Sequence, residues 1–519
     1  MRILFSVRNP SYVRHYDSVL RLLAARGHEI DLVTEESGRK PWPPAVRALA
    51  DEHRGIRLGA LPAPADARWY ELATRLRQGR FYLRFLDPVY RQMPALLART
   101  REKAPAPVVR LSASALGRSA LARRMLTRLL DLLERAARTP AAWHDYLRAQ
   151  RPDAIVLTPL VVLKTAQIDL ARAAVELGIR NVFAVASWDH LSSKGELTFR
   201  PQRVFVWNDV QKHEAVTLHQ IPAERVVVTG SQVFDDWFDR APSATRGEFC
   251  ARAGLPADRP ILLYVCSALL EGAPPEPEFV LAWARHLRGS GHAVLRECSI
   301  LVRPHFKRGE EWRGIDFAGL GHIVCWPPAG DVPVDATSKA DYFDSLFHAS
   351  VVVGLNTSAL IEAAIVGRPA HTVLLPEYRD SQEGTVHFHY LLDGPGALLH
   401  AARSLDDHAR QAAAALEGRD PDPGRSARFV RAFVRPGDAA AAATARFVDA
   451  LEALGAEPAP APEPAPWWAG ALRPALGPFA TAAAERVRRA SEERRQRKAA
   501  ALDEHRRARQ AARVHRAGL

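Results

Sequence analysis

The sequence predicts an α/β protein built from two successive doubly wound domains. Short apolar runs alternate with helical periodicity in two separate sets, and a polar stretch with Pro and Gly near residues 239–259 divides them. The length of 519 residues is also more than one hydrophobic core usually serves. Parallel sheets of this kind bind ligands at the carboxyl ends of their strands, so we expect functional residues in the loops that follow strands.

The first set of alternating elements opens at the N-terminus. Residues 3–7 form an apolar run, a helical pattern follows between Val19 and Leu23, and residues 30–33 form a second apolar run. A strand, a helix and a strand joined by so short a turn form a βαβ unit with parallel strands. Further strands are expected at residues 154–157, 181–186, 204–207 and 226–229, with helices at residues 164–177 and 210–219.

The second set follows the polar stretch. Strands are expected at residues 261–265, 300–302, 323–326, 351–353 and 372–374, with helices at residues 279–287, 342–348 and 358–366. Pro436 and Gly437 are expected to open a last helix that runs through Leu454.

These elements divide the chain into five parts. We predict a first domain (residues 1–240) with a basic helical insert at about residues 67–139, a second domain (241–436), a final helix (437–455), a semi-rigid Pro/Ala linker (456–468) and an Arg-rich tail (469–519).

The net charge of +13 is concentrated in two appendages. Residues 67–139 contribute +11 and residues 485–519 contribute +7, so the rest of the chain is mildly acidic. The insert interleaves arginines with aromatic residues, and an amphipathic helix at residues 71–86 suits either an anionic membrane surface or an extra helical layer with a solvated Arg face. The tail is polar nearly all round, which predicts an exposed helix or disorder. No motif indicates a specific nucleic acid as a partner.

Several classes of protein are excluded by what the sequence lacks. The four cysteines, Cys250, Cys266, Cys298 and Cys325, lie far apart and form no disulfide or zinc pattern, which predicts reduced thiols in a cytoplasmic protein. The N-terminus is too short an apolar run for a signal peptide, and no apolar stretch is long enough to span a membrane. We find no good acidic metal motif, so we expect neither a metal nor a cofactor.

The most informative segment surrounds the expected strand at residues 351–353. Asn356, Thr357 and Ser358 follow it and open a helix, where hydroxyl and backbone N–H groups can bind an anion. Glu362 lies four residues after Ser358 on the same face and could accept hydrogen bonds from a ribose. An ordinary helix cap with a first-turn acid is the alternative. Arg303, His305, Lys307 and Arg308 follow another strand and suit phosphate, unless they form a plain basic surface loop. Gly230 and Ser231 supply a third small polar loop after the strand at residues 226–229.

In this order, these segments resemble the GT-B glycosyltransferase superfamily over roughly residues 1–454. The closest likeness is to the CDP-glycerol glycerophosphotransferase type. ASWDHLSSKG (186–195) resembles that family's acceptor segment, VTGSQVFDDWF (228–238) its inter-domain segment, and VRPHF its Arg-x-His segment. The stretch from Ser338 to Glu362 resembles its nucleotide segment, a pattern also shared with sugar-nucleotide 2-epimerases.

The resemblance implies roles for individual residues. Thr357 and Ser358 would hold the donor pyrophosphate, Glu362 the ribose, and Arg303 and His305 the donor phosphate or the sugar or glycerol oxygens. Two departures favour a sugar donor over glycerophosphate. The family's Trp-His-Gly is Trp188-Asp189-His190 here, and Leu355-Asn356 replaces the Tyr/Asp before the paired hydroxyls.

Inverting transfer needs a base for the acceptor hydroxyl. Asp189 or His190 is our first candidate and His15 the second; a surface or capping role is the alternative for each. Glu383 and His387, in a His-rich loop after the last expected strand, are candidate donor contacts, with core packing as the alternative. Without a metal, the loop at residues 356–358 and the cationic loop would stabilise the leaving group.

We therefore expect a glycosyltransferase that moves a sugar from a nucleotide-activated donor to a cell-surface glycan or lipid-linked acceptor. We expect it to be cytoplasmic and peripheral on the inner face of an anionic membrane. A CDP-glycerol-type polyol-phosphate transferase, a sugar-nucleotide 2-epimerase and an inactive GT-B membrane-associated scaffold are the alternatives.

Overall fold

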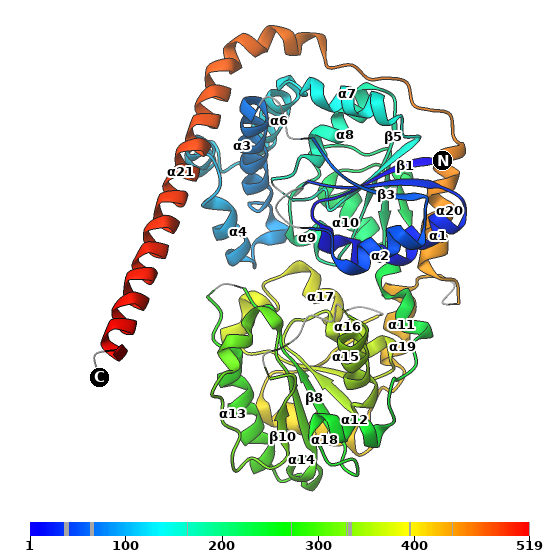
Figure 1. Cartoon of the computed structure of the whole chain (residues 1–519), viewed down its shortest axis with the longest axis vertical. Helices are drawn as coiled ribbons and strands as arrows, with labels where there is room; N and C mark the ends of the chain where they lie inside the picture. The colour runs from blue at the N-terminus through cyan, green and yellow to red at the C-terminus, as the bar shows by residue number, and fades with distance from the viewer. Residues whose placement is uncertain are drawn as a thin grey trace.

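The structure is a computed structural model, and it describes residues 1–35, 41–62, 67–162, 164–270, 272–328, 330, 335–393, 396–437 and 440–517. Two α/β domains lie one above the other, with α9 and α17 at their facing ends (Figure 1). α9 spans His190–Ser193 and α17 spans Val386–Leu392. The predicted fold class is confirmed.

Seven parallel strands form the first sheet, in the order β3-β2-β1-β4-β5-β6-β7. Ile3 of β1 pairs with Ile30 on one side and Ala154 on the other, which places β1 inside the sheet rather than at an edge. The strands are β1 (Arg2–Val7), β2 (Glu29–Thr34), β3 (Ile56–Ala60), β4 (Ala154–Thr158), β5 (Arg180–Ala184), β6 (Arg203–Val206) and β7 (Val226–Val228). Alternate β1 side chains enter different cores, because helices cover both faces of a parallel sheet.

The helices of the first domain and its crossover are η1 (Pro10–His15), α1 (Asp17–Ala25), α2 (Pro44–Glu52), α7 (Ala141–Gln150), α8 (Gln167–Glu176), α9, α10 (Asp209–His219), η3 (Ala223–Arg225), η4 (Gln232–Phe234) and α11 (Asp235–Asp239).

Six parallel strands form the second sheet, in the order β10-β9-β8-β11-β12-β13. They are β8 (Ile261–Val265), β9 (Ser299–Arg303), β10 (Ile323–Cys325), β11 (Val351–Val353), β12 (Ala370–Val373) and β13 (His400–Ala402). The helices are α12 (Arg246–Ala253), α13 (Glu276–Gly289), α14 (Ala293–Glu297), η5 (Phe306–Trp312), α15 (Ala336–His348), α16 (Ala359–Ile365), η6 (Pro376–Ser381), α17, α18 (Leu405–Leu416), α19 (Arg425–Phe429) and the π-helix η7 (Val430–Val434).

The chain returns to the first domain through α20 (Ala443–Ala456). Phe447 of α20 packs between the rings of Tyr16 and Phe205, with centroids 6.0 and 5.0 Å away. Asp235 fixes the start of α20, because its carboxylate accepts hydrogen bonds from the backbone N–H groups of Ala443 and Thr444 and pairs with Arg435. The chain therefore crosses between the domains twice, and the two crossings are tied together.

The helical insert consists of α3 (Ala67–Arg84), η2 (Pro88–Tyr90), α4 (Pro94–Arg101), α5 (Ala106–Ala113) and α6 (Ala120–Ala136). Arg77 of α3 is 2% exposed and pairs with Glu134 at 2.7 Å and with Asp169 at 3.0 Å. The arginines at the centre of α3 therefore point into the protein. The arginine-rich face expected on the helix at residues 71–86 is not turned to solvent there.

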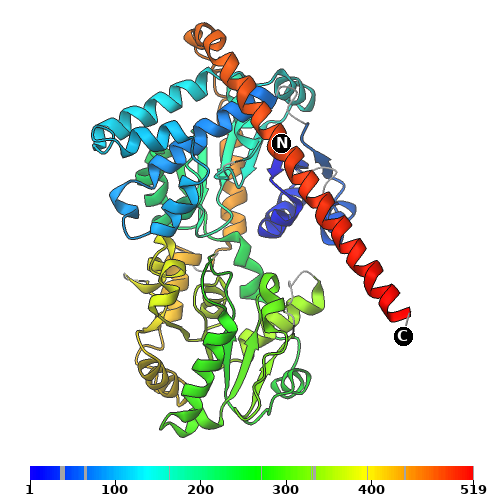
Figure 2. The same cartoon turned by 90° about the vertical axis from the view of Figure 1, so that its left-hand side faces the viewer.

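The tail forms one long helix, α21 (Trp467–Ala517), that runs across the insert (Figure 2). Its first part packs against α3 and α6 through Ala469, Ala480 and Ala483, and Arg473 donates a hydrogen bond to the Ala136 carbonyl. Farther along, residues 485–497 are mostly exposed. Of the two predicted states for the tail, the structure contains the helix.

Three local predictions were wrong. The stretch at residues 239–259 contains α12, which begins with a capping box between Thr245 and Glu248. The last helix begins at Ala443 rather than at Pro436. Strands β3 and β13 were missed because Ile56–Ala60 and His400–Ala402 lack continuous apolar runs.

Candidate active site

Loops from both domains meet at what we call the interdomain junction. From the first domain come η1, after β1, and α9, after β5; from the second come α17 and the start of α16. The Nε2–H of Gln232 donates to the His15 carbonyl at 3.2 Å, and Ser193 Oγ lies 3.0 Å from His387 Nδ1 across the junction. The carboxyl edges of both sheets therefore contribute residues to one place.

The α9 loop carries Asp189 and His190. The Asp189 carboxylate accepts a hydrogen bond from Ser187 Oγ at 2.6 Å and pairs with Lys194 at 2.9 Å. Burial raises the pKa of Asp189, but the Lys194 ammonium, His190, His387 and the Ser187 hydroxyl together outweigh it and hold that pKa well below its usual range. Asp189 is therefore ionised, with both oxygens already engaged.

His190 is buried and uncharged. Burial lowers its pKa to about 4, although Asp189 opposes that shift. Within the described residues, neither ring nitrogen has a hydrogen-bond partner, and Nδ1 is fully buried. An uncharged imidazole with a free lone pair can accept a proton, and the adjacent Asp189 carboxylate would stabilise the imidazolium that forms.

His15 and His190 share a neighbouring ring, that of Tyr12. The Tyr12 ring is 5.7 Å from the His15 ring and 6.5 Å from the His190 ring, centroid to centroid. Burial, together with Arg14 and His190, lowers the pKa of His15 to about 3. Arg14 Nε donates to His15 Nε2 at 3.3 Å, so the lone pair of that nitrogen is engaged and His15 is less suited to act as a base.

His387 joins the two domains. Its ring meets the Trp188 ring edge-on, 4.6 Å between centroids, and burial lowers its pKa to about 4. Nearby, the Tyr390 hydroxyl donates to Glu214 at 2.7 Å, and burial raises the pKa of Glu214 to about 7. Both contacts connect α17 to the first domain. His387 thus contacts the first domain through a hydrogen bond and a ring contact, and its role as a donor contact stays a prediction.

The α9 loop is also held from outside by the insert. Arg84 donates to the carbonyls of Lys194 and Gly195 at 3.3 and 3.1 Å and also reaches the Leu191 carbonyl; Arg99 donates to the Ser193 carbonyl at 2.8 Å. Guanidinium groups thus satisfy the free carbonyls at the end of this four-residue helix. Sequence reasoning missed both arginines, because only the folded insert brings them to the loop.

On the second domain, the polar loop after β11 is partly engaged. The Asn356 N–H donates to Ser267 Oγ at 3.0 Å, and its side-chain amide donates to the Ser381 carbonyl. Thr357 and Ser358 remain partly or fully exposed, and α16 begins at Ala359 without a side-chain cap from Ser358. Asn356 therefore positions the loop, and Thr357 and Ser358 are its accessible hydroxyls.

Glu362 faces the junction from α16. Its carboxylate accepts a hydrogen bond from the Tyr342 hydroxyl. Burial raises the pKa of Glu362 to about 7, while the Tyr342 hydroxyl and the Arg14 guanidinium of the first domain oppose the shift. Ser267 was missed by sequence reasoning. It follows β8, and Glu276 fixes it by accepting a hydrogen bond from its N–H at 2.9 Å.

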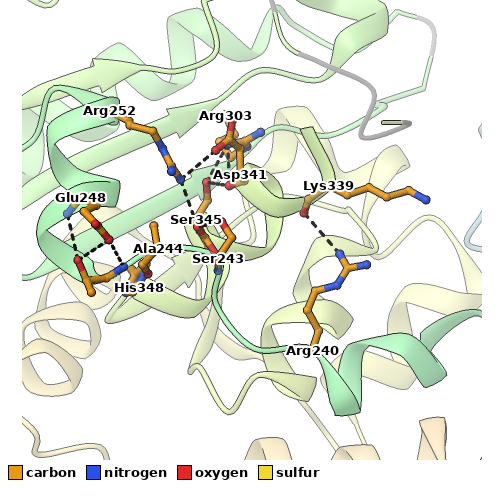
Figure 3. A network of polar contacts seen from close by, with 12 residues as sticks. Arg240, Ser243, Ala244, Glu248, Arg252, Arg303, Lys339, Asp341, Ser345 and His348 are labelled. Atoms are coloured by element: carbon orange, nitrogen blue, oxygen red, sulfur yellow. Dashed lines mark hydrogen bonds and ion pairs between the residues drawn. The ribbon is translucent and has the colours of Figure 1, made fainter. Parts of the chain in front are cut away.

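The cationic loop after β9 is divided between two roles. Arg303 is 6% exposed and lies against the rings of Trp326 and Tyr342. It donates to Ser345 Oγ at 2.7 Å and to the Asp341 carbonyl (Figure 3). Arg303 is thus built into its own domain rather than presented to a donor, contrary to our expectation.

The rest of that loop is more open. His305 caps η5 by accepting from the Lys307 N–H at 3.3 Å, and burial lowers its pKa. Lys307 is exposed beside the Phe306 ring, while Arg308 pairs with Glu311 at 2.6 Å. His305 and Lys307 are therefore the accessible members of the cationic loop.

Three other residues that we predicted to contact the donor are engaged within the protein. Gly230 and Ser231 are buried at the crossover, and a Cβ on Gly230 would lie 2.6 Å from Arg446 and 2.8 Å from Ala443. Because Gly230 also has φ +89°, that position requires glycine for packing. Glu383 pairs with Arg403 at 2.8 Å within the second domain. The contacts that these residues make lie within the crossover and the second domain.

Comparisons with known proteins inform the fold. No family model matches the chain, and no curated protein matches its sequence. A provisionally assigned UDP-N-acetylglucosamine 2-epimerase from Listeria monocytogenes matches in structure, with 11% identity, a TM-score of 0.51 and coverage of 87% of this chain and 96% of that chain. MnaA of S. aureus, solved with UDP, matches with 10% identity, a TM-score of 0.50 and coverage of 87% and 96%.

The chain has the GT-B fold. The architecture that the resemblance implied is confirmed. The wall teichoic acid polymerase TagF matches at 9% identity with a TM-score of 0.42, covering 87% of this chain and 88% of TagF. That similarity is too low to bear on the reaction, so the closer likeness to the CDP-glycerol type rests on the sequence segments alone. Within the described part of this GT-B chain, no three His, Cys, Asp or Glu side chains gather as a metal site would require.

Proposed function

We propose that this GT-B chain is a glycosyltransferase that moves a sugar from a nucleotide-activated donor to a cell-surface glycan or lipid-linked acceptor. The observation that supports this most is His190. It is an uncharged imidazole without a hydrogen-bond partner among the described residues, and it lies where the acceptor-side domain meets the second domain. A buried histidine without hydrogen-bond partners lowers the stability of the fold, but it is suited to proton transfer.

In the proposed reaction, His190 takes the proton of the acceptor hydroxyl as its oxygen attacks the anomeric carbon. The bond between that carbon and the donor diphosphate breaks, and the nucleoside diphosphate leaves with the electron pair. Asp189 stabilises the imidazolium, and Lys194 keeps Asp189 ionised. His15 packs against the Tyr12 ring.

The donor is assigned to the second domain. Thr357 and Ser358 donate hydroxyl hydrogen bonds to the diphosphate, and Lys307 and His305 offset its charge. Glu362 accepts hydrogen bonds from the ribose. No metal or cofactor enters this proposal.

The acceptor side includes a membrane surface. No helix within the described ranges is both long and apolar enough to cross a bilayer. α5, α6 and the turn between them instead expose an apolar ridge, which consists of Leu111, Leu116, Leu121, Met125, Leu129 and Leu132. Arg124 and Arg128 flank the ridge on α6, an arrangement that suits an anionic lipid surface. We propose a cytoplasmic, peripheral location, and the four free thiols agree with it.

A nucleotide panel tests the donor site. Thermal shifts with UDP-, GDP-, CDP- and dTDP-activated donors should show selective stabilisation by one nucleotide. Glu362→Ala and the more conservative Glu362→Gln should reduce that stabilisation. Glu383→Ala, an acid of the same domain that pairs with Arg403 instead, is the matched control and should retain it. Indifference of the wild-type chain to every donor would instead support the inactive scaffold.

Product analysis then separates the reactions. With the stabilising donor, His190→Gln should lower kcat by about 100-fold or more, as expected when a general base is lost. Release of nucleoside diphosphate with an acceptor-linked sugar supports the proposal. Release of CMP from CDP-glycerol would indicate polyol-phosphate transfer, and an epimerised product formed without an acceptor would indicate the epimerase.

A further inference from the structure

A second charged site lies outside the interdomain junction. A cavity of about 1770 Å³ opens between the insert and the outer side of the first domain. Its walls come from α3 and α6 on one side and from residues 196–203, the end of α10 and the Pro/Ala segment on the other. Drug-sized ligand sites are typically about 300–1000 Å³, so this cavity has room for an extended chain.

The lining is strongly positive. Ten arginines and five carboxylates line the cavity, which leaves a net charge of +5 when its histidines are neutral. Some of these arginines are committed within the fold: Arg80 pairs with Asp131 and Glu196, Arg84 donates to carbonyls of the α9 loop, and Arg203 pairs with Glu457. These residues build the wall rather than offer free charge.

Three other arginines of the lining remain available to a ligand. Arg124 and Arg128 on α6 and Arg200 after α9 are exposed, and in the described part of the chain none of them makes a hydrogen bond or an ion pair. Like charges gathered around one cavity repel each other unless a polyvalent anion neutralises them. A guanidinium group binds phosphate oxygens in a fork, and a chain of phosphates can engage several forks at once.

We propose that this cavity binds a phosphate-rich chain through Arg124, Arg128 and Arg200. The residues that follow the α9 loop, Glu196 to Arg200, form part of its wall, so a bound chain lies next to the candidate acceptor loop. The phosphates can come from a soluble phosphorylated glycan or from lipid headgroups beside the apolar ridge. Binding of a ligand to this cavity can be measured without turnover, so its test does not depend on the proposed transferase reaction.

Binding of end-labelled linear polyphosphate to the full-length protein tests the proposal by fluorescence anisotropy. The variant R124Q/R128Q/R200Q should bind at least about tenfold more weakly. It should also lower the slope of log Kd against log salt by about two to three, because each lost phosphate contact removes about one. The matched control R47Q/R54Q/R285Q removes three exposed arginines outside the cavity and should bind like the wild type.

Two further arms identify the source of the phosphates. Vesicles of phosphatidylcholine with and without phosphatidylglycerol are compared with the polyphosphate. If the cavity variant loses polyphosphate binding but still binds anionic vesicles, the phosphates come from a soluble chain. If it loses both, they come from lipid headgroups. Retained polyphosphate binding in the cavity variant, or an equal loss in the control variant, would overturn the site. Melting temperature and donor-induced thermal shift, measured on both variants, show that folding and the donor site are intact.

Discussion

The helices α3 and α6 lie side by side in the insert, yet they use their arginines in opposite ways (Figure 1). α3 turns Arg77 and Arg80 inward, where Glu134 binds both. α6 turns Arg124 and Arg128 outward beside the apolar ridge. The comparison shows that an excess of basic residues does not define a binding surface. Only the arginines without an internal acid are available to a ligand or a membrane.

The largest expected effect is on folding. Arg77→Met leaves Asp169 buried without its counter-charge and leaves Glu134 with only the longer contact to Arg80, which should destabilise the protein by about 3–5 kcal/mol. Arg128→Met on α6 should change stability by no more than about 0.5 kcal/mol. Urea denaturation followed by circular dichroism measures both. Equal effects of the two substitutions would contradict the inference that only the α3 arginines stabilise the fold.

A second inward arginine should affect turnover. Arg84→Met removes hydrogen bonds to the α9 loop and should lower kcat by about 10- to 100-fold, since catalytic loops lose efficiency when misplaced slightly. The α6 substitution Arg128→Met should leave kcat with a small soluble acceptor unchanged. Arg84→Lys, which keeps the charge without the fork, should recover only part of the rate. A fully active Arg84→Met protein would show that the clamp does not position the loop.

Acid should weaken the pairing between the arginines of α3 and Glu134, which is an acid of α6. Burial raises the pKa of Glu134, but Arg77 outweighs it with help from Arg172 and Arg80, so the net pKa lies below the ordinary value of 4.5. The unfolded chain therefore takes up this proton first. The stabilisation is present above the ordinary pKa and is lost as pH falls through the folded pKa. Urea midpoints measured at descending pH should fall less steeply in Glu134→Gln, and identical slopes would contradict the prediction.

The smallest effect on stability is expected at the apolar ridge. Met125→Glu with Leu129→Glu should change the free energy of unfolding by no more than about 0.5 kcal/mol, because both side chains are at least half exposed. Co-sedimentation with anionic vesicles should nevertheless fall. Phe306→Glu, an exposed apolar residue of the second domain, is the control. Undiminished vesicle binding by the ridge variant would remove the membrane from the proposal.

Much of the fold could be predicted because parallel strands are buried on both faces. Runs such as Ile261–Val265 and Val351–Val353 are continuous and apolar, and the structure contains them at those bounds. β13 was missed because it is short and begins with His400. α12 was missed because its polar residues were interpreted as a linker.

The candidate site could be predicted only in part. Residues after strands were good candidates, since the ends of parallel strands gather at one edge; His190, Thr357 and Glu362 fit that logic. What sequence cannot show is which polar groups already have partners. Arg303 looked available for phosphate, but Ser345, Trp326 and Tyr342 enclose it. Arg84 looked like surface charge, but it supports the α9 loop.

A crystal structure of the protein with its best-stabilising nucleotide donor would show the proposed donor and acceptor sites together. The diphosphate should lie against Thr357 and Ser358, the ribose should reach Glu362, and the sugar should point toward His190. A nucleotide bound elsewhere, with its sugar directed away from the first domain, would contradict it.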